Sequence, residues 1–184
     1  MASSSRPLDP RRLDVSALAA AAVELAGEWP LIGFARLAGA TLPAPPASVV
    51  GWKVRGERAT LAGGGVRPAL AIEAAAVVTL ECQRCLQPMQ LPLTIARRIF
   101  FVDGEEAAAA LDLDSDDDVL ALPPALDLHH LLEDELLLAL PVVPRHEACA
   151  VPLASAAGGE GSIEPEPEHP FAALAALKLG PRLN

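Results

Sequence analysis

The sequence has 184 residues, enough for one domain with a hydrophobic core and additional tails. Hydrophobic residues make up 52% of it but aromatic residues only 3%, so the core must be built mainly from aliphatic side chains and alanine. The net charge of −10 argues against a uniformly basic nucleic-acid-binding protein. Three cysteines are too few for a disulfide scaffold and indicate a reducing compartment.

The charge is unevenly distributed along the chain. Residues 1–101 carry eleven Arg or Lys against seven Asp or Glu, whereas residues 102–184 carry three against seventeen. A polyanion-binding face combined with an acidic tail would produce this asymmetry. Acidic loops that keep a protein soluble would produce it too, and on charge alone this simpler interpretation is preferred.

The N-terminal segment imitates a targeting peptide through its early arginines and its alanine run. Asp9, Asp14 and Glu24 lie in or beside that run, however, and targeting peptides contain few acidic residues. No apolar run approaches the roughly 20 residues of a membrane span. We therefore expect a soluble cytoplasmic protein without a membrane segment.

The first part of the chain predicts a helix followed by strands. Residues 10–26 have the apolar spacing of a helix, which Gly27 and Pro30 are expected to end. Residues 48–61 alternate like a half-buried strand, with a turn expected at Gly56. The three glycines at 63–65 predict a second turn, without the Lys and Ser or Thr of a phosphate-binding loop.

Two long strands are predicted next, over residues 69–82 and 91–102, joined through the stretch CQRCLQP. With the preceding strand they predict an antiparallel meander. Residues 103–118 are strongly acidic and are expected to form a solvated, mobile loop. Its aspartates have part of a calcium-loop spacing, but Asp117 and Pro123 replace the required glycine and glutamate, so calcium is rejected.

Residues 126–141 form the clearest predicted helix, with Asp127 as its N-cap and Pro141 as its end. One face carries a leucine stripe that is predicted to be buried. The other face is predicted to be a solvated polar surface in which pairs four residues apart interact. The stripe consists of Leu128, Leu131, Leu132, Leu136 and Leu140, and the polar face carries His129, His130, Glu133 and Asp134.

These elements predict a single α+β domain over residues 1–154. Its antiparallel sheet could close into a barrel, and it carries an N-terminal helix and a late amphipathic helix. Residues 155–169 are rich in Gly, Pro and Glu and predict a linker. Residues 170–184 regain apolar character and are interpreted as a C-terminal docking peptide, too short to be a stable helix alone.

The cysteines allow three interpretations. Cys82 and Cys85 form a C-x-x-C pair, and His146 with Cys149 repeats the spacing, so a four-ligand zinc site is formally complete. The flanks lack the glycines usual in zinc knuckles. A redox pair would open a helix, whereas Cys85 precedes a turn and a strand. The sequence favours metal-free structural cysteines and no cofactor, with zinc as the first alternative and redox chemistry as the second.

Enzyme motifs are lacking in the sequence, which contains neither G-x-S-x-G, H-E-x-x-H nor a dinucleotide fingerprint. Aromatic platforms for base stacking are scarce, so RNA binding would depend on basic side chains that contact phosphates. Arg84 is the strongest candidate, because the turn between the cysteines would hold it outward. The full set of candidates is Arg11, Arg12, Arg36, Lys53, Arg55, Arg84, Arg97 and Arg98.

Four segments occur in an order and spacing that resemble one protein family: DPRRL, ECQRCLQPM, DLHHLLEDELLLALPVVPRH and HPFAALAALK. The chain resembles the YceD family, the large ribosomal RNA subunit accumulation proteins of bacteria and plastids. The resemblance implies a non-enzymatic, cytoplasmic factor needed for large-subunit ribosomal RNA to accumulate. Some members carry a second C-x-x-C near the C-terminus, where this chain has only His146 and Cys149.

Two functions are therefore expected. The first is binding to ribosomal RNA or to a pre-large-subunit particle. The alternative is a protein adaptor whose acidic half binds a basic ribosomal protein. A zinc or redox enzyme is the least favoured interpretation, and the sequence does not indicate an oligomeric state.

Overall fold

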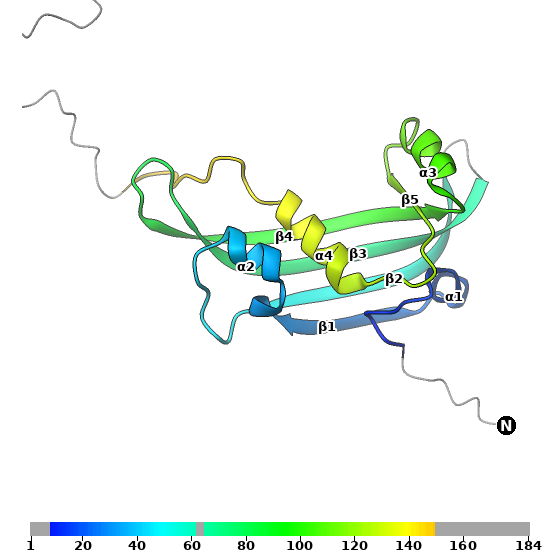
Figure 1. The fold of residues 1–184 in the computed structure, drawn as a ribbon, viewed down its shortest axis with the longest axis horizontal. Coiled ribbons are helices and arrows are strands. Elements are labelled where there is room, and N and C mark those ends of the chain that lie inside the picture. Colours follow the sequence, from blue (N-terminus) through cyan, green and yellow to red (C-terminus); the bar gives the residue numbers. More distant parts are fainter. Residues whose placement is uncertain (1–7, 62–64, 150–184) are drawn as a thin grey trace, which may run out of the picture. The chain divides into compact units, whose positions relative to one another are not determined.

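The computed structural model describes residues 8–61 and 65–149 (Figure 1). One five-stranded sheet has the strand order β1-β2-β3-β4-β5. Its strands are β1 (Glu24–Pro30), β2 (Val49–Leu61), β3 (Gly65–Glu81), β4 (Pro88–Val102) and β5 (Asp118–Ala121). Neighbours from β1 to β4 are antiparallel, so the predicted meander is confirmed, and β5 pairs with β4 in parallel.

Four short α-helices and one 3-10 turn accompany the sheet in the part of the chain that the structure describes. They are α1 (Val15–Ala21), the 3-10 turn η1 (Leu31–Gly33), α2 (Ala35–Ala40), α3 (Glu105–Asp112) and α4 (Leu128–Leu138). No helix among the described residues is long and apolar enough to cross a membrane. The predicted linker, the predicted docking peptide and the first two glycines of the 63–65 turn lie outside the described residues.

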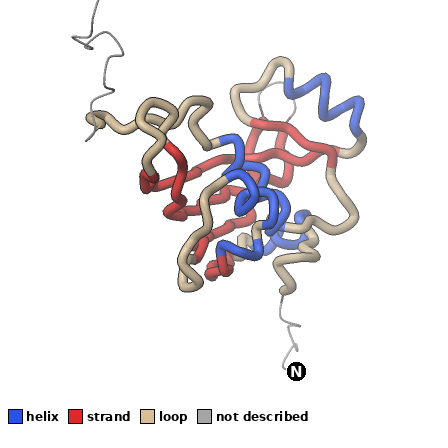
Figure 2. Tube along the Cα trace, turned by 60° about the vertical axis from the view of Figure 1, so that its left-hand side comes forward, coloured by secondary structure: helices blue, strands red, loops and turns tan. Residues whose placement is uncertain are grey.

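The sheet is open, so the barrel that the sequence allowed is wrong. Within the described residues β1 pairs only with β2 and β5 only with β4, which leaves two edges. Closure is not needed to bury the apolar face of the sheet, because α2 and α4 lie against that face (Figure 2). The predicted α+β class with a mainly antiparallel sheet is confirmed.

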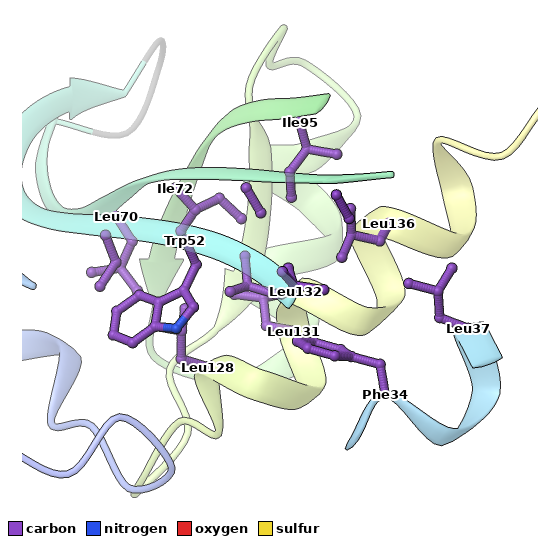
Figure 3. Close-up of a cluster of buried hydrophobic side chains, with 14 of the residues drawn as sticks. Phe34, Leu37, Trp52, Leu70, Ile72, Ile95, Leu128, Leu131, Leu132 and Leu136 are labelled. Atoms are coloured by element: carbon purple, nitrogen blue, oxygen red, sulfur yellow. The ribbon is translucent and has the colours of Figure 1, made fainter. Parts of the chain in front are cut away.

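The core lies between α4 and strands β2, β3 and β4. Figure 3 shows Leu128, Leu132 and Leu136 of α4 close to side chains from the sheet, among them Trp52 and Ile72. The helix begins as predicted, because an Asp127 carboxylate oxygen accepts a hydrogen bond from the backbone nitrogen of His130 at 3.2 Å.

The polar face of α4 is only partly solvated, so the prediction of a wholly exposed surface is wrong. His130 is exposed and pairs with Asp134, at 3.4 Å between Nδ1 and Oδ2. His129 and Glu133 are each only 6% exposed. The segment that contains α2 covers them, and the His129 ring stacks on Phe34 with 4.0 Å between ring centroids. Packing from a distant segment has overridden the local amphipathic pattern.

The N-terminal helix is shorter than the predicted 10–26, because α1 ends at Ala22 in a left-handed conformation with φ 50°. Residues beyond it form the edge strand β1. Gly27 was expected to help end the helix but instead pairs with Trp52 in β2. A Cβ atom at Gly27 would lie 2.8 Å from the Trp52 ring, so the glycine permits close strand pairing.

The turn predicted at Gly56 is also wrong, because β2 runs through this residue without interruption. A Cβ atom there would lie 2.4 Å from the carbonyl carbon and oxygen of Leu18 in α1. The glycine therefore marks a close approach of α1 to the sheet.

The acidic stretch 103–118 contains α3, whereas a loop was predicted. Glu105 and Glu106 occupy the first turn, where the helix dipole favours negative charge, and an alanine run follows. Ala108 is buried in a second apolar cluster with Phe100 and Val119. This cluster lies on the sheet face opposite α4. Ile99 belongs to the core beneath α4, and the next residue of the strand, Phe100, points to the other face.

Candidate functional site

The turn between β3 and β4 carries the C-x-x-C pair. The backbone nitrogen of Cys82 donates to the carbonyl of Gln87 at 3.0 Å, and that of Leu86 donates to the carbonyl of Cys82 at 2.8 Å. Leu86 has a φ of 57°, in the left-handed region that glycine usually occupies. Leu86, the residue after the second cysteine, therefore has a backbone conformation that glycine would adopt more readily.

A second segment returns to this turn after α4 ends, as Figure 1 shows. The backbone nitrogen of Gln83 donates to the carbonyl of Pro144 at 2.9 Å. The backbone nitrogen of His146 donates to the Sγ of Cys82 at 3.4 Å. These contacts place His146 and Cys149 beside the hairpin turn.

All four residues of the formal zinc set converge. Cys82, Cys85, His146 and Cys149 each offer one ligand atom, and these atoms lie within 4.8 Å of one another. The Sγ atoms of Cys82 and Cys149 are 3.9 Å apart, and the Sγ of Cys85 is 3.4 Å from the Nδ1 of His146. Cys82 is buried, and the other two cysteines are half-buried.

The thiols of the turn differ in acidity. Burial raises the pKa of Cys82, but backbone N–H groups of His146, Arg84 and Cys85 outweigh this and lower the pKa to about 5. The N–H of Gln87 lowers the pKa of Cys85, but burial and the side chains of Cys149 and Cys82 raise it above its ordinary value. The cluster therefore stabilises Cys82 as a thiolate and holds the thiols of Cys85 and Cys149 next to it.

Arg84 connects the two segments, and its guanidinium does not project freely as the sequence suggested. Its Nε donates to the Sγ of Cys149 at 2.9 Å, and its Nη2 donates to the carbonyl of His146 at 2.9 Å. The side chain is exposed to solvent, but its donors point back to residues 146–149. The bonds tie the hairpin to the segment that follows α4.

Most other basic candidates are already ion-paired within the fold. In the described part of the chain, Arg12 is the one candidate for which neither an ion pair nor a side-chain hydrogen bond is found. The pairs and their nitrogen–oxygen distances are Arg11–Asp127 (4.0 Å), Arg36–Glu133 (3.0 Å), Lys53–Glu24 (3.3 Å), Arg55–Glu57 (3.2 Å), Arg97–Glu135 (3.5 Å) and Arg98–Glu57 (2.9 Å).

The candidates do not share one surface. Arg97 pairs with Glu135 of α4, so it lies on the helix-covered face. Arg98 lies on the opposite face with Lys53 and Arg55, as expected for adjacent residues of a regular strand. Arg84 lies at the hairpin end of the sheet. The structure thus divides the basic residues among at least three places.

Two further arginines were left out of the candidate set. Arg58 of β2 and Arg67 of β3 line a hollow together with Ser16 of α1. Neither forms an ion pair within residues 8–61 and 65–149. The strand register would not have revealed this, because it pairs Arg58 with Pro68 and Arg67 with Ala59, so a regular pair of strands would place the two side chains on opposite faces.

The family described as "Large ribosomal RNA subunit accumulation protein YceD" matches residues 70–178, more than half of the chain. The chain belongs to the YceD family. YceD proteins are ribosome-assembly factors and not a known enzyme family, and membership implies a role in accumulation of large-subunit ribosomal RNA. No solved structure matches the chain.

The matched range begins in β3 and includes the cysteine turn, α4 and the segment that carries His146 and Cys149. The resemblance seen in the sequence is therefore confirmed, including its ribosome-assembly context. The cysteine cluster lies inside the part of the chain that identifies this YceD protein.

Proposed function

We propose that this YceD protein supports accumulation of large-subunit ribosomal RNA by binding a basic protein of the pre-large-subunit particle, and not by binding naked RNA. The observation that carries the proposal is the internal pairing of the basic side chains. Six of the eight basic candidates contact carboxylates, and Arg84 contacts a cysteine sulfur and backbone carbonyls.

Ion pairs at a surface contribute little to stability, so a phosphate could in principle displace a carboxylate. The displaced carboxylate would stay nearby, however. A phosphate that reached Arg98 would lie close to Glu57 and Asp117, which both contact this arginine. Repulsion between these negative charges would offset much of the attraction to the guanidinium.

The acidic residues, by contrast, exceed the basic ones available to pair with them. The chain carries 24 Asp or Glu against 14 Lys or Arg. In the described part, Asp103, Glu105, Glu106, Asp114 and Asp116 form no ion pair. This surplus supports attraction of a positively charged protein segment over distances near the Debye length, about 8 Å at physiological salt.

The test uses the purified full chain with two kinds of ligand. Purified basic ribosomal proteins of the large subunit and protein-free large-subunit RNA would be titrated separately, at several salt concentrations. We expect binding to at least one basic protein. We also expect a variant with Asp103→Asn, Asp114→Asn and Asp116→Asn to bind it more weakly, because three charges are removed. Arg12→Gln is the matched control and should bind that protein as the wild type does.

Direct RNA binding remains the second candidate, because Arg12, Arg58 and Arg67 form no ion pair in the described residues. Tight binding to protein-free RNA with a steep salt dependence would favour it, since each phosphate contact adds about 0.7 to 0.9 to the log–log slope. Weaker RNA binding by Arg58→Gln, with no effect of the three asparagine substitutions, would refute the adaptor proposal.

A further inference from the structure

The geometry assigns a structural zinc site to Cys82, Cys85, His146 and Cys149. Three thiolates and one imidazole are the ligand types that zinc prefers in closed sites. All four are supplied by the protein, so no position would remain for a substrate or a reactive water. The site would hold the segment after α4 against the β3–β4 hairpin, independently of how the protein takes part in ribosome assembly.

Two of the distances between ligand atoms match those of a tetrahedron around one zinc ion, and all of the ligand atoms lie within 4.8 Å of one another. Zinc–sulfur bonds of about 2.3 Å separate two sulfurs of a tetrahedral site by about 3.8 Å. With zinc–nitrogen bonds of about 2.0 Å, sulfur and nitrogen lie about 3.5 Å apart. The structure has 3.9 Å between the Sγ atoms of Cys82 and Cys149, and 3.4 Å between the Sγ of Cys85 and the Nδ1 of His146.

Hydrogen-bond donors hold two of the sulfurs in place. The backbone nitrogen of His146 donates to the Sγ of Cys82 at 3.4 Å, and the Nε of Arg84 donates to the Sγ of Cys149 at 2.9 Å. Such donors stabilise a charged sulfur and fix its direction. The left-handed conformation of Leu86 turns the chain after the second cysteine. The absence of a glycine therefore does not argue against a knuckle here, because the backbone has the required form without it.

A disulfide or redox role fits the same atoms less well. A disulfide requires sulfurs about 2.05 Å apart, and the sulfurs of Cys82 and Cys149 are nearly twice that distance from each other. Cys82 has no exposed surface, so a redox partner could not reach its sulfur. Neither role would account for His146, whose ring nitrogen faces Cys85.

Arg84 has a place in this site as an outer contact. Three thiolates and one neutral imidazole around a divalent zinc ion leave one net negative charge. The guanidinium of Arg84 lies next to that charge through its 2.9 Å hydrogen bond to the Sγ of Cys149. Donors to ligating sulfurs orient them and tune their affinity for the metal. This arrangement makes Arg84 a positioning residue of the site.

The segment after α4 has little else to hold it. Leu140 still packs against the core, but residues 141–149 beyond it contain neither helix nor strand, and Val142 is 99% exposed. Its contacts with the hairpin are the hydrogen bond from Gln83 to Pro144 and the bonds that involve the cysteine cluster and Arg84. Ordering such a segment costs conformational entropy, which coordination by one metal ion would offset.

The experiment measures metal in the purified full chain under reducing conditions, by elemental analysis and by exchange with cobalt. We expect one zinc ion per chain. The cobalt form should show the thiolate-to-metal absorption and the strong visible bands of a tetrahedral sulfur-rich site. A chelator strong enough to remove the metal should lower Tm by more than about 5 °C.

The variants separate loss of a ligand from loss of the fold. Cys149→Ser and His146→Ala should each lose bound zinc, whereas His146→Cys should retain it with four thiolates. Glu147→Gln is the matched control, since it lies between two ligands without supplying one, and should keep one zinc. A folded wild-type protein without metal, a disulfide found in place of free thiols, or full zinc content in Cys149→Ser would overturn the assignment.

Discussion

Glu133→Ala should destabilise the domain far more than Asp134→Ala, although both residues contact the same arginine. The Oε1 of Glu133 accepts hydrogen bonds from the backbone nitrogens of Arg36 at 2.7 Å and Leu37 at 3.3 Å. These are first-turn donors of α2, whose N-cap residue Phe34 has no side chain that can accept them. Glu133 therefore caps α2 from a different helix.

The magnitude follows from the groups that would lose partners. A hydrogen bond to a charged group contributes about 1.5–3 kcal/mol, and loss of an N-cap costs about 1 kcal/mol in typical cases. The hydrogen bond from Leu37 is long, so we assign it the lower end of the range for a hydrogen bond to a charged group. The side chain of Arg36 is 45% exposed, so its ion pair with Glu133 adds little stability. We expect a loss of about 3 kcal/mol in the free energy of unfolding.

Urea denaturation at neutral pH measures this loss, with Asp134→Ala as the matched control. Asp134 also contacts Arg36, but its side chain is 43% exposed and caps no helix. Asp134→Ala should therefore stay close to the wild type. Equal urea midpoints for the two alanine variants would refute the capping argument.

The pH dependence provides a second measurement of the same contact. Burial raises the pKa of Glu133, but the N–H groups of Arg36 and Leu37 and the guanidinium lower it below its ordinary value in the net. The stability that the ionised carboxylate provides is therefore present above about pH 4.3, the unfolded value, and is lost as the pH falls through the folded pKa. The stability difference between the wild type and Glu133→Gln should shrink in acid.

Two further predictions concern packing. His129→Ala should lower the free energy of unfolding in urea by about 2 kcal/mol, because the ring is buried and stacks on Phe34. Burial lowers the pKa of His129, so the stability that the neutral ring provides should decline as the pH falls below about 6.5, the unfolded value. If His129→Ala unfolds at the same urea concentration as the wild type, the burial argument is wrong and His129 belongs to the solvated face that the sequence predicted. Gly56→Ala should lower Tm because its Cβ would clash with the backbone of Leu18. Gly39→Ala should raise Tm slightly, because Gly39 is an exposed helical position of α2 with open space around its Cβ. Equal effects of the two alanines in thermal unfolding would contradict the close approach.

The site shows how far sequence reasoning could go. The four possible zinc ligands can be named from their spacing alone, but their convergence depends on a hairpin turn and a segment more than 60 residues later. The sequence argument counted the missing glycine against a knuckle, whereas the structure shows that Leu86 adopts a left-handed backbone in this hydrogen-bonded turn. The pairing of the basic residues was equally hidden, since partners such as Arg97 and Glu135 belong to different elements.

Local patterns in the sequence alone determined β2, β3, β4 and α4, because the residues that encode the alternation, the leucine stripe and the Asp127 cap are neighbours along the chain. Only the tertiary structure decided that the stretch after Ala22 becomes strand β1, that the sheet stays open, and that His129 and Glu133 are buried. Each of these outcomes depends on a partner from a distant segment: β2 for β1, the helices for the sheet, and the α2 segment for His129 and Glu133. The free energy of such contacts exceeds the small local propensities that a sequence pattern reports.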